Sequence, residues 1–272
     1  EGIFLNPTET KVYTTSGLAA ENRVYEYTLS TPSNVSTASL TTSFSLRQSS
    51  AKGIAFNPTG LEFYVCNNNI PEVQKFTLTS AFNLNTIQYP KGYLNLNTDG
   101  LNSPYGFYIR PDGRKLFVIE NVDASQDIFE YTLSTPWELN TQTLVGIFNL
   151  NDAFTDINFK PDGTKMYLVN NNANTTSSVD EYRLTTPWSI ATAGISTSFV
   201  IGNNDTTPYG ITITPDGSRF YICGDERDLV YPYEMTTPWD LRTARRVSED
   251  LSVLSQDTLS LGLAFSSDGS KV

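Results

Sequence analysis

Two tyrosines and a set of short polar loops are the side chains in this sequence best suited to binding chemistry. Tyr105 and Tyr209 each follow a proline and precede a glycine. A tyrosine ring stacks on the C–H face of a sugar, and an amide forms paired hydrogen bonds with hydroxyl groups. The polar loop residues that accompany these rings are Asn68, Asn121, Asp123, Asn171, Asp225 and Asp228. This composition predicts a site for a glycan or a protein surface, against the alternative that the loops are only solvated.

The acidic loop around Asp225 is the one segment that suggests catalysis. Asp225, Glu226 and Asp228 could act as general acid and base in glycoside hydrolysis, or could coordinate Ca²⁺. Arg227 lies among them, and the sequence shows no matching second acidic cluster, nucleophile elbow or phosphate-binding loop. We therefore expect no enzyme, no cofactor and no metal site, and keep a polysaccharide-active enzyme as an alternative.

Composition excludes several further classes of function. The 272 residues carry a formal net charge of −11 and no histidine. A nucleic acid or an anionic membrane requires a basic face, so neither is expected as a partner. The missing histidine removes Ser-His-Asp catalysis and His-ligated zinc. No apolar run approaches the roughly 18 residues that span a bilayer, so no membrane insertion is expected.

The elements that must position these loops are visible as a repeat of about 52 residues. One segment recurs six times, as in GIAFNPTGLEFY from Gly53, GFYIRPDGRKLF from Gly106 and GITITPDGSRFY from Gly210. Each copy reads as two alternating strands around a Pro-Asp-Gly turn, where proline presets φ and glycine accepts a positive φ. A third strand such as IFEYTLSTPW (from Ile128) and a fourth such as TQTLVGIFNL (from Thr141) follow.

Four antiparallel strands per unit predict an all-β fold, a β-propeller of four-stranded blades. The chain is expected to form a single propeller domain, residues 1–272. The predicted complete blades are about 2–52, 53–105, 106–155, 156–209 and 210–261, with a partial sixth blade at 262–272. A sixth blade that stops at its first hairpin leaves a strand edge unpaired. We expect a truncated longer propeller, with closure on blade 1 or an assembly partner that completes the blade as alternatives.

Repeated residues are interpreted as structural because every copy has the same neighbours. The turn aspartates are expected to cap their own turns; they are Asp112, Asp162, Asp216 and Asp268. The tryptophans are expected to pack between blades; they are Trp137, Trp188 and Trp239. Blade 1 departs from this pattern, with Glu9-Thr10 in place of Asp-Gly and Ser33 in place of tryptophan. Cys66 and Cys223 occupy equivalent positions in separate blades and read as buried thiols, not as a disulfide.

Variable loops are the more informative positions. Loops between the second and third strands, and those between successive blades, are expected on one face at the mouth of the channel. Such loops tolerate change while the sheets hold them in place. The candidate tyrosines, amides and carboxylates all belong to these two loop sets.

The strings PDGTKMY and VYEYTLSTPW together resemble the tandem repeats of phage structural proteins and marine-bacterial secreted proteins, near the YVTN and NHL-like propellers. The resemblance covers nearly the whole chain and rests on turn and packing residues. It implies a non-enzymatic binding or structural module, extracellular or associated with a virion. An architectural subunit of a larger assembly is the alternative.

Overall fold

A computed structural model describes most of the chain. The described residues are 2–16, 22–46, 50–120, 126–150, 152–171, 176–201, 206–224, 229–247, 250–252 and 262–264. Strands dominate these residues, and the only helical elements among them are short 3₁₀ turns. No helix in the described part of the chain is long and apolar enough to cross a membrane.

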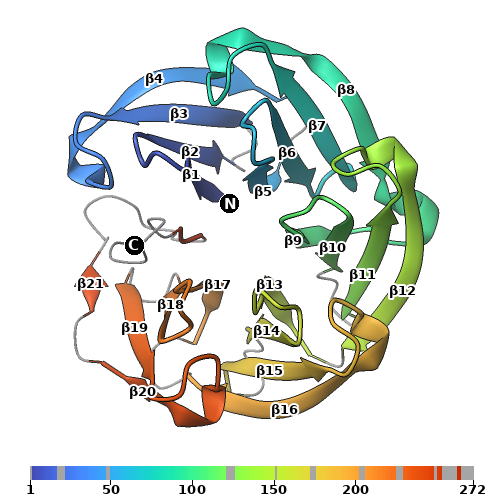
Figure 1. Ribbon diagram of the computed structural model, residues 1–272, viewed down its shortest axis with the longest axis vertical. Helices are drawn as coiled ribbons and strands as arrows, with labels where there is room; N and C mark the ends of the chain where they lie inside the picture. Colours follow the sequence, from blue (N-terminus) through green and yellow to red (C-terminus); the bar gives the residue numbers. More distant parts are fainter. Residues whose placement is uncertain are drawn as a thin grey trace. The chain divides into compact units, whose positions relative to one another are not determined.

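The strands form five antiparallel sheets, each built from consecutive strands (Figure 1), which we call blades 1 to 5. Blade 1 comprises β1 (Ile3–Leu5), β2 (Lys11–Ser16), β3 (Arg23–Leu29) and β4 (Ala38–Ser45). Blade 2 comprises β5 (Ala51–Phe56), β6 (Glu62–Asn67), β7 (Glu72–Leu78) and β8 (Ile87–Asn95). Blade 3 comprises β9 (Pro104–Ile109), β10 (Lys115–Glu120), β11 (Gln126–Leu133) and β12 (Gln142–Leu150). Blade 4 comprises β13 (Phe154–Phe159), β14 (Lys165–Asn170), β15 (Ser178–Leu184) and β16 (Ala193–Val200).

Blade 5 has a divided fourth strand. It comprises β17 (Pro208–Ile213), β18 (Arg219–Gly224), β19 (Leu229–Met235), β20 (Ala244–Arg246) and β21 (Leu251–Ser252). Both β20 and β21 pair with β19, at opposite ends of that strand. The predicted all-β propeller of four-stranded antiparallel blades is confirmed. The partial sixth blade is not, because the described residues 262–264 carry no strand and the rest of 262–272, including Asp268, lies outside the described residues.

Each blade has a turn end, where its first two strands are joined and its third meets its fourth. At the first of these turns in blade 3, the Gly113 amide donates to Arg110 O at 2.7 Å and φ of Gly113 is 71°. Trp137, at the second, donates its amide to Gly113 O at 2.9 Å and has φ 65°. A Cβ on Gly113 would lie 2.3 Å from the Trp137 ring. Glycine is therefore needed for both its dihedral and its lack of a side chain.

Blade 1 has the same turn geometry with different residues at the glycine and tryptophan positions. The register places Glu9, with φ 58°, at the glycine position, so the sequence alignment of Glu9-Thr10 with Asp-Gly was one residue out. Ser33 replaces the tryptophan, donates its amide to Glu9 O at 2.9 Å, and donates its hydroxyl to the Glu9 carboxylate. A ring would clash with the Glu9 side chain, so the two exchanges belong together.

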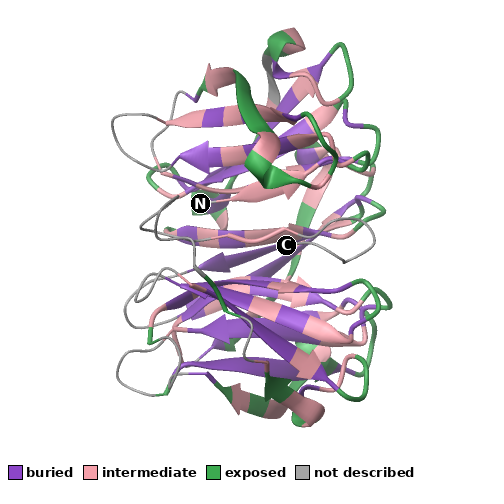
Figure 2. Ribbon diagram, turned by 90° about the vertical axis from the view of Figure 1, so that its left-hand side faces the viewer, coloured by how far each residue is buried: buried purple, intermediate pink, exposed green. Residues whose placement is uncertain are grey.

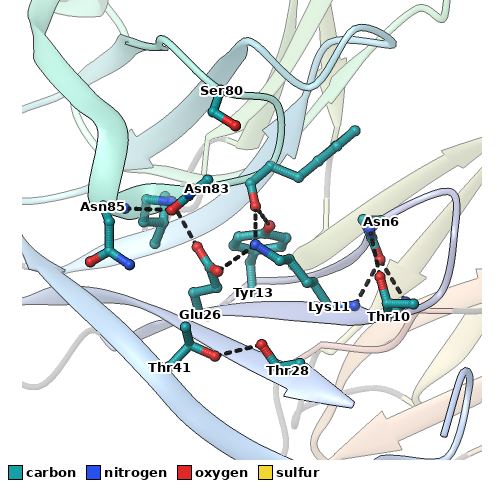
Figure 3. Close-up of polar contacts among 12 residues, drawn as sticks. Asn6, Thr10, Lys11, Tyr13, Glu26, Thr28, Thr41, Ser80, Asn83 and Asn85 are labelled. Atoms are coloured by element: carbon teal, nitrogen blue, oxygen red, sulfur yellow. Dashed lines mark hydrogen bonds and ion pairs between the residues drawn. The ribbon is translucent and has the colours of Figure 1, made fainter. Parts of the chain in front are cut away.

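A polar clasp joins the turn end of one blade to the next (Figure 3). Lys11 Nζ and the Tyr13 hydroxyl both donate to Phe82 O, at 2.7 and 2.6 Å. The fully buried Glu26 pairs with Lys11 at 2.7 Å and accepts the Leu84 amide, also at 2.7 Å. Blade 4 repeats this clasp on blade 5. There, Lys165 and Tyr167 donate to Trp239 O, and Glu181 accepts the Leu241 amide at 3.0 Å.

Blade 2 carries the clasp with its charges exchanged. Glu62 stands where blade 1 has Lys11, and Lys75 stands where it has Glu26. Lys75 Nζ lies 2.6 Å from Glu62 and 2.7 Å from Glu138, and donates to Trp137 O at 3.2 Å. The carboxylate that caps an amide in blade 1 is thus replaced by an ammonium that requires an acidic partner on blade 3.

The chain divides into two compact units, which are described separately. Unit 1 holds blades 1 and 2 with most of blade 3, up to residue 122 and over Phe129–Val145. Unit 2 holds the described residues of Gly146–Ser270, with 126–128. Among the described residues, apolar clusters surround Tyr13, Phe56 and Phe63 and also Tyr64, Leu116 and Tyr131 in unit 1. Another surrounds Tyr167, Phe220 and Tyr233 in unit 2. Buried residues lie mainly on the second and third strands, whereas exposed residues lie at the turns and along the fourth strands (Figure 2).

Candidate functional site

The end of a blade opposite its turn end, which we call its loop end, carries a β-bulge in four of the five blades. In blades 2 to 5 the first strand pairs with the second on both sides of one extra residue. These extra residues are Lys52, Tyr105, Thr155 and Tyr209. A bulge leaves one residue outside the ladder and re-aims its side chain, and bulges are over-represented beside active sites. Both predicted tyrosines therefore occupy positions that the backbone sets apart.

In unit 1 two bulge residues meet. Lys52 Nζ lies over the Tyr105 ring, 4.7 Å from its centroid. This is the geometry of a cation–π contact, which holds an aromatic ring in a defined orientation. Tyr105 is half-buried, so part of its ring surface reaches solvent.

Asn68 connects the two loop sets beside this ring. Its Nδ2 donates to Ser103 Oγ at 2.9 Å and to Pro104 O at 3.0 Å, directly before Tyr105. Its backbone amide donates to Ser50 O at 3.0 Å. The loop between β6 and β7 and the segment between β8 and β9 therefore lie at one end of unit 1, as the strand order predicts.

A buried polar row crosses blade 2 next to Asn68. Asn67 and Glu72 pair directly across β6 and β7, and Gln74 Nε2 donates to Glu72 Oε1 at 2.6 Å. Burial raises the pKa of Glu72, opposed by the Gln74 hydrogen bond. A carboxyl group of raised pKa in a polar cluster is a feature of functional sites.

Unit 2 places a carboxylate where other blades have glycine. Asp156 follows the bulge residue Thr155 and replaces the glycine that begins the repeat in blades 2, 3 and 5. Its oxygens accept the amides of Ile157 at 2.8 Å and Ile211 at 2.9 Å, so it bridges β13 to β17. Burial raises the pKa of Asp156 to about 6, although both backbone amides act in the opposite direction.

The predicted site residues fall into three groups. Tyr105 and Asn68 are brought together in unit 1 by the Pro104 contact. Tyr209 and Asn171 lie at the loop end of unit 2, where the Asn171 amide donates to Ala153 O at 2.7 Å. The remaining predictions lie outside the described residues; they are Asn121, Asp123, Asp225 and Asp228.

The described turn aspartates, Trp137 and Trp239 have the structural roles predicted for them, whereas Trp188 packs against Phe159 of its own blade. Each described turn aspartate accepts the amide two residues on: Asp112 from Arg114, Asp162 from Thr164 and Asp216 from Ser218, at 2.9–3.0 Å. Trp137 and Trp239 pack beside Tyr64 and Tyr167 of the preceding blades. Both cysteines are buried and neither forms a disulfide, and burial raises the pKa of the Cys66 thiol.

Sequence reasoning missed Lys52, Thr155, Asp156 and the polar row of blade 2. A signal was present for three of these. Lys52 and Thr155 stand at the position of Tyr105 in the repeat, and Asp156 breaks the glycine pattern. The polar row had no such signal, because the alternation of Glu72, Val73 and Gln74 predicts that the two polar side chains are solvated.

Comparison with known proteins identifies the fold and no family. No family model and no curated protein matches the chain. A functionally unknown protein from Desulfotomaculum acetoxidans is 16% identical with a TM-score of 0.61, covering 91% of this chain and 71% of that one. Hydrazine synthase from Kuenenia stuttgartiensis is 14% identical with a TM-score of 0.67, covering 99% and 78%. A chain of a nidogen/laminin complex is 12% identical with a TM-score of 0.63, covering 96% and 82%. At these identities the similarity is one of fold, and the chain is an all-β propeller-type protein.

Proposed function

We propose that this protein is a non-enzymatic binding module that takes a glycan through the loop ends of its blades. The observation that carries the proposal is the contact between Lys52 and Tyr105 beside Asn68. Both side chains come from bulges, where an antiparallel sheet holds a re-aimed residue in place. A half-buried tyrosine ring with neighbouring amide and ammonium groups matches the apolar face and hydroxyl edge of a sugar.

Variation between blades supports the same function. The bulge position carries lysine, tyrosine, threonine and tyrosine in blades 2 to 5, whereas the turn end repeats the same contacts. The acidic charge makes a nucleic-acid partner unsuitable. The resemblance of the repeats to phage structural and secreted proteins supports a place on a virion or in the extracellular space.

An architectural role is the second candidate, and one observation favours it. Fourth strands expose large apolar side chains; in blades 1 to 4 these are Leu40, Tyr93, Val145, Ile147, Ile195 and Val200. Exposed apolar side chains on the fourth strand of a blade suit contacts with other subunits. On this reading the fourth strands, not the loop ends, face the partner.

A glycan array followed by titration calorimetry tests the first proposal. We expect specific hits, and about tenfold weaker binding after Tyr105→Ala, since ring contacts contribute roughly 1 kcal/mol beyond area burial. Tyr93→Ala is the matched control, because Tyr93 is 63% exposed on a fourth strand. Equal losses in both variants, or binding unchanged by Tyr105→Ala, would reject the loop-end site. No hits from a folded protein that forms multimers would favour the architectural role.

A further inference from the structure

The polar row of blade 2 contains buried atoms that lack partners. Asn67, Glu72 and Gln74 are 0%, 7% and 9% exposed. Asn67 and Glu72 are directly opposed, and Gln74 lies two residues along the strand from Glu72, so all three side chains share one face of β6 and β7. Among the described residues, no hydrogen-bond partner is found for Asn67 Oδ1, Asn67 Nδ2 or Gln74 Oε1.

Such atoms are costly. A buried polar group without a hydrogen bond has lost its contacts with water and gained none within the protein, which destabilises the fold. Buried polar groups in native proteins are therefore almost always satisfied by protein, water or ligand. Two of the three, Asn67 Oδ1 and Gln74 Oε1, are oxygen acceptors on one sheet face beside a buried carboxylate, and one electropositive group would satisfy both.

Blade 4 shows that these positions do not have to be unsatisfied. Asn170, Ser178 and Asp180 occupy the same register positions as Asn67, Glu72 and Gln74. There, Asn170 Nδ2 donates to Asp152 Oδ2 at 2.8 Å, and Ser178 Oγ donates to Asp180 Oδ1 at 2.9 Å. The asparagine is retained, and its amide is satisfied by a carboxylate of the same blade.

We propose that Asn67 Oδ1, the Glu72 carboxylate and Gln74 Oε1 form a binding site for a hard metal cation, with Ca²⁺ as the probe. Hard cations take oxygen ligands from carboxylates and amide carbonyls. The chain offers three such oxygens on one face, and two of them have no other partner. This inference concerns a different site from the glycan-binding surface and does not depend on it.

The charges around Asn67, Glu72 and Gln74 favour a bound cation. No ion pair among the described residues involves Glu72. Lys52, the basic residue on the neighbouring β5, lies over the Tyr105 ring. Burial raises the pKa of Glu72, and a bound cation would favour the ionised form. With one carboxylate, the affinity should be in the weak range of about 10⁻⁴–10⁻³ M typical of extracellular modules.

Calorimetry and thermal unfolding of the chelator-treated chain with CaCl₂, MgCl₂ or NaCl test the site. We expect Ca²⁺ to bind with a millimolar or tighter Kd. At tenfold excess over Kd, it should raise the folded-to-unfolded ratio about elevenfold. Glu72→Gln and Asn67→Leu should abolish this response. Asn67→Leu removes the unpaired amide, so the cation-free variant should be at least as stable as the wild type.

Two further variants test whether the response to Ca²⁺ is specific to this site. Glu234→Gln makes the same charge change in unit 2, where Glu234 pairs with Arg219 and Arg245, and should retain the response. Asn67→Asp adds a second carboxylate and should tighten Ca²⁺ binding by about tenfold. A response that survives Glu72→Gln, or a wild-type chain that responds to none of the three cations, would overturn the proposal.

Discussion

The pKa values of carboxyl groups are shifted in opposite directions at the turn ends and the loop ends of the blades. At the turn ends, hydrogen bonds from Arg110 lower the pKa of Asp112, and backbone and hydroxyl donors at Ser218 lower that of Asp216. At the loop ends, burial raises the pKa values of Glu72, Asp156 and Asp180. Hydrogen bonds stabilise the ionised carboxylates at the turn ends, whereas burial destabilises the ionised carboxylates at the loop ends.

The difference indicates that the two ends of a blade have different roles. Residues that recur at the turn end satisfy one another, so their role is complete within the fold. Loop-end residues differ between blades and leave charges or amides that an external group would stabilise. Perturbed pKa values gather at functional sites for this reason. The turn ends should therefore govern stability, and the loop ends should govern binding.

The largest effect is expected at the clasp. Glu26→Ala should lower the free energy of unfolding by about 3–5 kcal/mol, because Lys11 and the Leu84 amide would lose their buried partner. Urea unfolding measures the change. Thr28→Ala is the control on the same strand, where an exposed hydroxyl pair with Thr41 is lost (Figure 3). A loss below about 1 kcal/mol for Glu26→Ala would contradict the structural role of the turn end.

Asp156 should give an intermediate effect that depends on pH. Its folded pKa of about 6 exceeds the ordinary value of 3.8, so the folded state binds the proton more readily. Stability should rise as pH falls from about 7 to about 4, by no more than about 3 kcal/mol. Partial solvent contact should reduce this rise.

Asp156→Asn isolates that contribution from the other acids. The difference between wild-type and variant stability, measured by urea unfolding at several pH values, should change between pH 4 and 7 in the direction stated. A difference that is constant with pH would show that Asp156 is not held ionised at a cost. A large loss at pH 7 would place it with the turn-end residues instead.

The smallest effect is expected from converting blade 1 to the common pattern. Glu9→Gly with Ser33→Trp should stabilise the chain by about 1 kcal/mol, through relief of the positive φ at Glu9 and burial of a ring on glycine. Ser33→Trp alone should destabilise it, because the ring would meet the Glu9 side chain. A double-mutant cycle by thermal unfolding measures the coupling, and additive single effects would contradict the paired exchange.

The sequence predicts the Asp-Gly turns and their tryptophans, but neither the clasps between blades nor most of the loop ends. Proline, aspartate and glycine have strong local preferences, so Asp112 and Gly113 reveal their turn without tertiary information. The bulge at Tyr105 is a property of strand register, which one strand does not encode. The lack of partners for Asn67 depends on side chains from other segments, and no pattern along β6 records it.

The exchanged charges of the blade 1 and blade 2 clasps bear on how similar repeats find their correct neighbours. Chains of near-identical units are prone to misassembly while they fold. Glu26 requires the free amide of Leu84, whereas Lys75 requires the carboxylate of Glu138. Lys75 contacts both Glu62 of its own blade and Glu138 of the next, so its charge is balanced by two carboxylates. The two clasps thus differ in the group that each takes from the following blade, which is a backbone amide for Glu26 and a carboxylate for Lys75.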